Sequence, residues 1–421
     1  MKASLYVRKK RGQIGVRNHI LIVPTTSCVN SVVKAIGKKF EGVRWGEYDE
    51  NRVIPITHGA GCCHVSLDED IAFRVLLGTV THPNIGGVLL VSLGCGQFCK
   101  VPAVDKSSQK KTLMGFTLYR RAMERGLRNI AWLNVMEPPT GKGGTEAAEK
   151  LGEKLVNRLI EKVSIISRTE HPIGDLTIAV LNGASDSTSG LYSNRAVGYF
   201  VDWFILNENG TVVFSQLTEI LGAEEYLLSK ATESARRKLK RALETAIAFR
   251  KGLSREMRMS DPTPGNIRAG ISTLAEKSIG SVLKAGMDPN IRLKGVVAYG
   301  MSIPHRGLFM MEGPGHDLTA LTGMAVGGAV ISLFTTGLGT PLGHALVPVI
   351  KITANESTYK KMAPNIDVFI DPSEIYHGKS LKEYSVSILK EKIKTHASGV
   401  PVKSEEHGFY DYTIRSMWML Q

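Results

Sequence analysis

Short apolar runs, each followed by a turn of small residues and then by an amphipathic segment, recur along the whole chain. Residues 53–56 lead into His58, and residues 86–92 lead into Gly94 and Cys95. Continuous apolar runs of this length are typical of parallel strands that are buried on both faces. Alternating strands and helices predict a parallel sheet covered by helices. We therefore predict an α/β protein with mainly parallel sheets and a site at the carboxyl ends of the strands.

The alternation breaks once, near residues 165–174, and a second strand-and-helix series then begins. A chain of 421 residues is long enough for two domains. We predict an N-terminal α/β domain over 1–168, which carries the Cys and His turns, and a C-terminal α/β domain over 169–421. Within the second domain we expect one long charged helix over 223–249. Residues 262–266 are expected to form a loop, because X-Pro steps disfavour helix.

One turn concentrates metal-binding side chains. Residues 57–64 contain His58, Cys62, Cys63 and His64, separated only by glycine and alanine. Imidazole and thiolate are the ligands that a borderline or soft divalent metal prefers. A tight turn with buried thiols is the alternative, since free cysteine is often simply buried.

All five cysteines lie between Cys28 and Cys99. This clustering favours a site over a set of scattered disulfides. Cys28 precedes a predicted helix, whose dipole would lower the pKa of the thiol. Cys28, His58 and Cys95 each follow a predicted strand, so the fold would bring them to one edge of the sheet.

The charge and hydropathy of the chain limit its partners. The net charge is +14, the N-terminus has no apolar signal segment, and no apolar run is long enough to cross a membrane. These features predict a cytoplasmic protein without membrane contact. The basic balance suits an enzyme of anionic small molecules. Nucleic-acid binding is a weaker alternative, because the sequence contains no nucleic-acid-binding motif.

Taken together, the short motifs resemble the altronate and galactarate dehydratase family of sugar-acid hydro-lyases, which also contains the large subunit of sulfolactate sulfo-lyase. The likeness covers nearly the whole chain. The motifs that carry it, in order, are Gly15-Val16-Arg17-Asn18, Thr57-His58-Gly59-Ala60-Gly61-Cys62, Gly94-Cys95, Ser185-Asp186, Glu219-Ile220, Pro262-Thr263-Pro264-Gly265-Asn266, Glu276-Lys277-Ser278, Phe334-Thr335-Thr336-Gly337 and Lys403-Ser404-Glu405.

The resemblance implies a cytoplasmic dehydratase that converts an aldonate or aldarate into a 2-keto-3-deoxy acid with the help of a divalent metal, first Fe²⁺ and otherwise Mn²⁺ or Zn²⁺. It also implies a small β-clip domain, expected here as a separate subunit because Met1 lies directly before the Gly15 motif, and a possible homo-oligomer. The candidate metal ligands are His58, Cys62, Cys95, Cys28 and His344, with His64 as a further possibility. The candidate acid/base residues are Asp186, Glu219 and Asp317, and the candidate substrate-binding residues are Arg17, Asn18, Asn266 and Lys277.

Several of these residues also have a structural interpretation. Asp186 could cap a turn, Glu219 could cap the helix that follows it, and Lys277 could be a solvated helix charge. Arg17 could pair with a structural carboxylate.

The chain departs from the family pattern at polar positions. Relatives usually have cysteine where this chain has Asn182 and His344, and Gly-Met where it has Cys63 and His64. Two alternatives therefore stay open. One is a C–S lyase that acts on a sulfolactate-like substrate, and the other is a non-catalytic member of the family that has lost the metal site.

Overall fold

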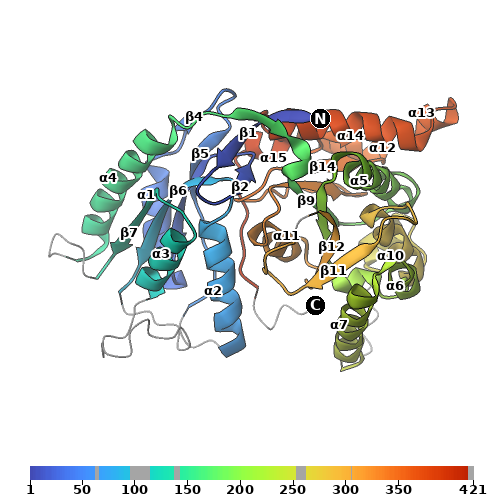
Figure 1. The fold of residues 1–421 in the computed structure, drawn as a ribbon, viewed down its shortest axis with the longest axis horizontal. Coiled ribbons are helices and arrows are strands. Elements are labelled where there is room, and N and C mark those ends of the chain that lie inside the picture. Colours follow the sequence, from blue (N-terminus) through green and yellow to red (C-terminus); the bar gives the residue numbers. More distant parts are fainter. Residues whose placement is uncertain (62–65, 95–113, 137–142, 253–261, 305, 416–421) are drawn as a thin grey trace.

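The computed structural model describes residues 1–61, 66–94, 114–136, 143–252, 262–304 and 306–415. Two lobes lie side by side, with the N-terminal lobe in blue to teal and the C-terminal lobe in green to red (Figure 1). Each lobe contains its own sheet with helices on both faces, and helix α2 (Ser66–Val80) stands where the lobes meet. The predicted α/β class with mainly parallel sheets is confirmed.

The N-terminal lobe is built on a five-stranded sheet with the order β4-β5-β3-β6-β7. All neighbours are parallel except β4 and β5. The strands are β3 (His19–Pro24), β4 (Arg44–Trp45), β5 (Asn51–Pro55), β6 (Ile85–Ser92) and β7 (Ile130–Asn134). Besides α2, the helices are α1 (Asn30–Lys38), α3 (Met114–Glu124) and α4 (Thr145–Val163).

Alternating side chains of this sheet supply two separate apolar clusters. Ile20 and Ile22 of β3 pack with α1 and α4, whereas Leu21 and Val23 pack on the opposite face with α2 and α3. In a strand that is buried on both faces, nearly all side chains are apolar, so apolar and polar residues do not alternate along it. This is the reason that the continuous apolar runs of the sequence predicted parallel strands correctly.

The C-terminal lobe is built on a parallel seven-stranded sheet with the order β11-β12-β10-β9-β13-β14-β15. The strands are β9 (Thr177–Asn182), β10 (Thr211–Phe214), β11 (Leu293–Val297), β12 (Gly307–Met311), β13 (Ile331–Thr335), β14 (Val349–Thr353) and β15 (Val368–Phe369). The helices are α5 (Asn194–Glu208), α6 (Glu224–Lys230), α7 (Glu233–Gly252), α9 (Pro264–Arg268), α10 (Leu274–Val282), α11 (Asp317–Val326), α12 (Glu356–Met362), α13 (Pro372–Tyr376), α14 (Leu381–Ala397) and α15 (Lys403–Glu406).

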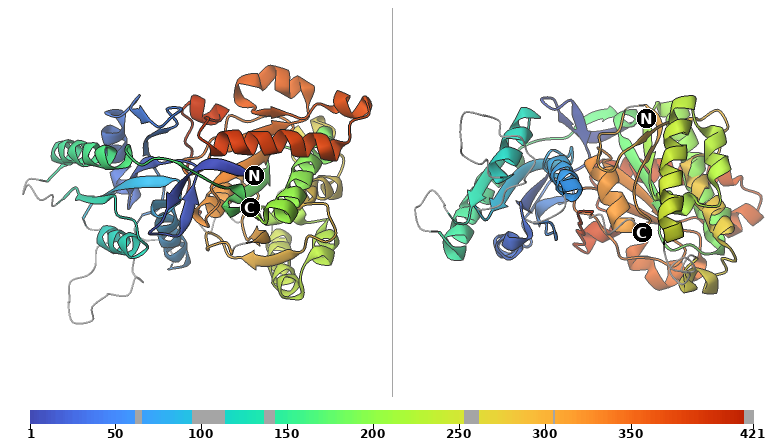
Figure 2. Two further views of the ribbon diagram at one scale, coloured as in Figure 1. Left: turned by 45° about the horizontal axis from the view of Figure 1, so that its top comes forward. Right: turned by 90° about the horizontal axis from the view of Figure 1, so that it is seen from below.

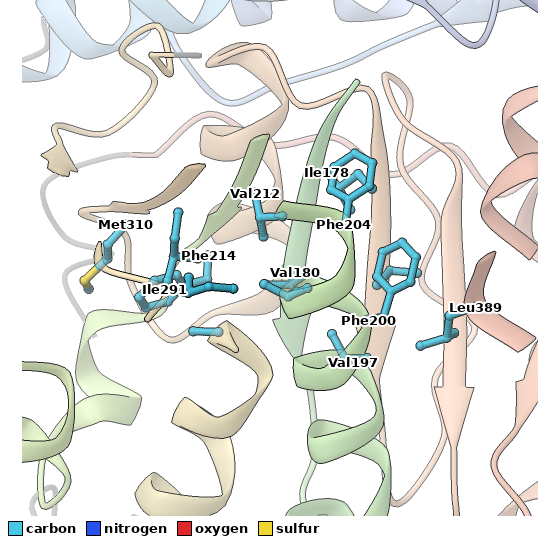
Figure 3. Close-up of a cluster of buried hydrophobic side chains, with 14 of the residues drawn as sticks. Ile178, Val180, Val197, Phe200, Phe204, Val212, Phe214, Ile291, Met310 and Leu389 are labelled. Carbon is cyan, nitrogen blue, oxygen red and sulfur yellow. The ribbon is translucent and has the colours of Figure 1, made fainter. Parts of the chain in front are cut away.

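The core of this lobe lies between α5 and the centre of its sheet. Phe200 and Phe204 of α5 stack with their ring centroids 5.8 Å apart, and both are fully buried. They belong to the same apolar cluster as Ile178 and Val180 of β9 (Figure 3). This packing fixes β9, whose carboxyl end carries the candidate site described below.

A third, antiparallel sheet was not predicted. Its order is β2-β1-β8, with β1 at Lys2–Arg8, β2 at Gln13–Gly15 and β8 at Thr169–Pro172. Strand β1 also lies beside the C-terminal helix α14 (Figure 2). Strand β1, in the basic N-terminal segment, therefore contacts β8 and α14, which are both distant from it in the sequence.

Two local predictions were wrong. The single helix expected over 223–249 is divided into α6 and α7, because Ala231 is extended and bridges to Leu293. Residues 262–266 are not a loop throughout, since α9 begins at Pro264. Proline is tolerated at the first helical position, where the missing N–H has no partner to lose, and Thr263 caps the helix.

The two lobes pack closely where α2 meets α11. A Cβ at Gly78 would lie 2.7 Å from both the Cβ and the carbonyl oxygen of Val326. We expect Gly78→Ala to lower the free energy of unfolding by about 1–3 kcal/mol through overpacking, as measured by urea denaturation. Gly265→Ala is the control, because its Cβ would meet its nearest neighbours at 3.7 Å. Equal effects of the two substitutions would contradict the expectation.

Candidate functional site

The strand order of the N-terminal lobe brings three of the predicted turns to one edge. Strands β5, β3 and β6 are parallel neighbours, so their carboxyl ends lie together. His58 follows β5 and Cys28 follows β3, within a short 3₁₀ turn over Ser27–Val29. Cys95 follows β6 but lies outside the described residues, as do Cys62, Cys63, His64 and Cys99.

The turns that carry Cys28 and His58 are bonded to each other. The backbone N–H of Ser27 donates to the Ala60 carbonyl at 2.8 Å. The Asn30 side-chain amide donates to the His58 carbonyl at 2.9 Å. Cys28, between Ser27 and Asn30, is a free and exposed thiol. The fold thus places a thiol and an imidazole on adjoining turns.

The His58 ring has the chemical state of a metal ligand. Its Nε2 lies 2.8 Å from the Pro24 carbonyl oxygen, which can only accept a hydrogen bond, so Nε2 carries the proton and Nδ1 keeps its lone pair. Nδ1 is buried and has no hydrogen-bond partner of normal geometry, although the backbone of Ala60 is near enough to raise the pKa. Burial outweighs this effect and lowers the pKa of His58. Metal-bound histidines commonly donate their other ring N–H to a backbone carbonyl in this way.

The other predicted donors do not complete a ligand set within the described residues. No three His, Cys, Asp or Glu side chains in those ranges are grouped so that they could hold a metal ion. His344 is fully engaged, because Nδ1 accepts from the Leu346 N–H at 3.1 Å and Nε2 lies 3.1 Å from the Thr322 hydroxyl. Burial lowers the pKa of His344 to about 3. Both ring nitrogens of His344 therefore have hydrogen-bond partners within the protein.

A second concentration of polar side chains lies at the carboxyl edge of the seven-stranded sheet. Asn182 ends β9, Gln216 follows β10, and Asp317 begins α11 after β12. The Gln216 side-chain amide donates to the Asn182 carbonyl at 2.8 Å and to the Asp317 carboxyl at 3.1 Å. Gln216 is fully buried and has a left-handed backbone with φ of 70°. This amide therefore links three strand ends at one point.

Two lysines and one glutamate extend this network. The Lys277 ammonium lies 3.6 Å from one carboxylate oxygen of Glu219, and the Ser281 hydroxyl lies 3.2 Å from the other. Lys284 donates to the Ser281 hydroxyl at 2.7 Å and also to the side chain of Asn182. Glu219 is therefore buried and ion-paired with Lys277, and Lys284 is connected to it through the Ser281 hydroxyl.

Burial shifts the pKa values of an acid and a base in the network toward neutral pH. Burial and the charge of Glu219 raise the pKa of Asp317 to about 7, against the opposing effect of Lys277 and Lys284. Burial also lowers the pKa of Lys284 to about 8, against the influence of Glu219. Perturbed carboxyl and amine groups of this kind cluster at functional sites.

Lys284, Ser281 and Gln216 were not predicted from the sequence. Lys277, Ser281 and Lys284 are spaced at i, i+4 and i+7, so they share one face of α10 and of the 3₁₀ turn, Leu283–Ala285, that continues it. That polar stripe was a usable signal. Gln216 gave no signal, because its role depends on a left-handed turn and on strands distant in the sequence.

A cavity of about 290 Å³ opens next to the network. Asp186, Ser189 and Lys277 line it together with the apolar side chains of Leu191 and Ile279. Of the network residues, Lys277 is the one that reaches this cavity. Its position makes it a candidate for binding an anionic ligand.

Asp186 is tied into its own turn. Its carboxylate accepts from the Ser189 N–H at 2.9 Å, from the hydroxyls of Thr188 and Ser189 at 2.9 and 2.8 Å, and from the Asn355 side chain at 2.6 Å. These bonds match the turn-capping interpretation. Asp186 shapes the cavity wall, with three donors on Oδ1 and one on Oδ2.

The predicted substrate-binding residues fall in different places. The Asn266 side chain donates to the Ser185 carbonyl at 2.9 Å and so supports the cavity wall. Arg17 and Asn18 are fully buried in the junction between the lobes. Arg17 forms a two-pronged pair with Glu405 at 2.7 and 2.8 Å, which matches its structural interpretation. Asn18 donates to the Val163 carbonyl at 2.8 Å.

Comparison with known proteins agrees with this architecture. The family described as D-galactarate/altronate dehydratase, C-terminal, matches residues 173–419. The one described as D-galactarate dehydratase/altronate hydrolase, second domain, matches residues 6–163.

Three curated relatives align along almost the whole chain. The altronate dehydratases of Bacillus subtilis and Escherichia coli are 29% and 28% identical over 97% of this chain, which spans 76% of each relative. The (2R)-sulfolactate sulfo-lyase subunit beta of Chromohalobacter salexigens is 26% identical, over 99% of this chain and 98% of the relative. Among the described helices, none is both long and apolar enough to cross a bilayer. From the two domain matches, which together run from residue 6 to residue 419, the chain belongs to the D-galactarate/altronate dehydratase family.

Proposed function

We propose that this chain is the large catalytic subunit of a hydro-lyase that removes water from an aldonate or aldarate and forms a 2-keto-3-deoxy acid. The observation that carries the proposal is the buried group of two carboxyls and two lysines at the carboxyl edge of the seven-stranded sheet. Dehydration next to a carboxylate needs one group that takes a proton and another that gives one. The carboxyls of Glu219 and Asp317 are the candidates for this pair.

The surroundings of each carboxyl suggest its role. Glu219, whose carboxyl lies 3.6 Å from the Lys277 ammonium and 3.2 Å from the Ser281 hydroxyl, is the candidate base for the proton on the carbon next to the substrate carboxylate. Asp317, with its pKa raised to about 7, is the candidate acid. It would give a proton to the β-hydroxyl as the C–O bond breaks, and the enol product would then tautomerise to the keto acid.

Lys277 connects this pair to the cavity. It lines the cavity and lies 3.6 Å from Glu219. An ammonium in this position would bind the substrate carboxylate and orient the adjacent C–H bond toward Glu219. Lys284 does not line the cavity, and we assign it the role of holding Asn182 and Ser281 in place through its hydrogen bonds.

We further propose that the Cys and His turns hold a divalent ion, with Fe²⁺ as the first candidate and Mn²⁺ or Zn²⁺ as alternatives. The described residues that fit are His58, through its buried Nδ1, and Cys28, through its free thiol. Cys62 and Cys95, outside the described residues, are the expected further ligands. A divalent ion bound to a hydroxy acid stabilises negative charge that develops on the substrate oxygens.

A C–S lyase is the second candidate function. It is favoured by the sulfo-lyase relative, because this chain spans 98% of that subunit but 76% of the altronate dehydratases. That relative is named as a beta subunit. We therefore propose that this chain also acts with a separate small subunit, expected to be a β-clip protein.

The test is a substrate panel with anaerobically purified protein. We would supply Fe²⁺, Mn²⁺ or Zn²⁺ in separate reactions, with and without a small β-clip partner, and offer aldonates, aldarates and sulfolactate. Formation of a 2-keto-3-deoxy acid is the expected result, and removal of the ion with a chelator should abolish it. Release of sulfite would instead support the C–S lyase. Neither product with any ion or partner would favour a non-catalytic family member.

A further inference from the structure

A second, larger cavity lies at the carboxyl edge of the seven-stranded sheet. Its volume is about 520 Å³, within the range of small-molecule sites. The turn after β10 provides Leu217 and Thr218, the turn after β12 provides residues 312–314, and α7 closes a further side. Neither Glu219 nor Asp317 lines this cavity. It is therefore a separate space from the one that Lys277 reaches.

The walls of this cavity carry three positive charges. Lys238 and Arg241 are three residues apart on α7, so their side chains share one face of the helix. Arg415 comes from the C-terminal segment, with its guanidinium 5.1 Å from the centre of the Tyr299 ring. The Tyr299 hydroxyl donates to the Thr319 carbonyl at 2.7 Å. The ring on which Arg415 lies is thus fixed in place.

One carboxylate, Glu312, lies among these cations. Its half-buried position raises its pKa, and the charges of Arg415 and Lys238 lower it. Both cations are thus within electrostatic range of the Glu312 carboxyl. Among the described residues that line the cavity, three are cations and one, Glu312, is an acid. Among these described lining residues, positive charges outnumber negative ones even when Glu312 is ionised.

We propose that this cavity binds a small molecule with two carboxylates. One carboxylate would bind to Lys238 and Arg241 on α7, and the second would bind to Arg415. The Thr218 and Thr245 hydroxyls also line the cavity. They would form hydrogen bonds with polar groups of the ligand that lie between its two carboxylates. This proposal does not depend on the lyase reaction, because it rests on residues outside the Glu219 network.

The test compares two probes of equal chain length. Adipate carries two carboxylates and hexanoate carries one, and neither has the hydroxyl groups that the proposed lyase reaction needs. Isothermal titration of the full chain should show adipate binding at least about tenfold tighter than hexanoate, since each charge-assisted contact contributes an effect of about this size. Equal affinities for the two probes would overturn the two-carboxylate site.

Four substitutions locate the binding. Arg241→Gln should weaken adipate binding by about tenfold, and Glu312→Gln should tighten it because a like charge is removed. Arg237→Gln is the matched control on the same helix, since Arg237 pairs with Glu233 at 3.2 Å and does not line the cavity. Equal losses in Arg237→Gln and Arg241→Gln would reveal unspecific attraction to a basic surface and would overturn the site. A loss of adipate binding that occurs only in Lys277→Gln would also overturn the site. Thermal melting without ligand would verify that each variant is folded.

Discussion

Asp317→Asn is expected to lower kcat/KM for the sugar-acid substrate by about a hundredfold to ten-thousandfold, the usual contribution of a general acid. The amide keeps the shape of the carboxyl and can still interact with Gln216, but it has no proton to give. The wild-type enzyme should lose activity as the pH rises above about 7, because the pKa of Asp317 is raised to about 7 and its protonated form disappears. The variant should lack that decline, so the measurement is kcat/KM against pH for both proteins.

Asp371→Asn is the matched control for this substitution. Asp371 caps α13 by accepting from the Ser373 N–H at 2.8 Å, and asparagine caps helices about as well as aspartate. Its kcat/KM should stay at the wild-type value. A pH profile with an unchanged decline above pH 7 in Asp317→Asn would remove Asp317 from the acid role, whatever the loss in rate.

Arg17→Met is expected to lower the free energy of unfolding by about 3–5 kcal/mol, because it leaves a buried carboxylate without its partner. Arg17 is fully buried and Glu405 nearly so, and their charged groups lie 2.7 Å apart. The measurement is urea denaturation followed by circular dichroism. The double variant Arg17→Met, Glu405→Leu should lose less than Arg17→Met alone, since both charges are then gone.

An exposed ion pair provides the comparison. Arg121 and Glu124 are each about half exposed and 3.1 Å apart. Pairs of this kind contribute about 0–1 kcal/mol, so Arg121→Met should have little effect. If Arg17→Met were no more destabilising than Arg121→Met, the interpretation of Arg17 as a structural residue would be untenable.

Local sequence patterns were sufficient to predict the α/β class and the side of each sheet that carries polar turns. The apolar runs identified buried parallel strands, and the rule for ligand sites at strand carboxyl ends placed Cys28 and His58 on adjoining turns. These features depend on a few consecutive residues. They are therefore accessible without knowledge of the three-dimensional contacts.

Pairings across long sequence distances were not accessible in the same way. Arg17 and Glu405 are 388 positions apart. The residues near Arg17 in the sequence do not indicate that its partner is the buried carboxylate of Glu405. Lys284 looks like an ordinary helical lysine until the strand ends beside it are known. Its altered pKa results from burial, which is a property of the assembled lobe rather than of the segment.

The small antiparallel sheet has a consequence for synthesis on the ribosome. Strand β1 is translated long before its partner β8, which begins at Thr169. Helix α14, which lies along β1, begins only at Leu381. The edge of β1 that pairs with β8 therefore stays unpaired until Thr169–Pro172 has been made, and its contact with α14 forms only near the end of translation. An unpaired strand edge is open to association with other chains during that interval.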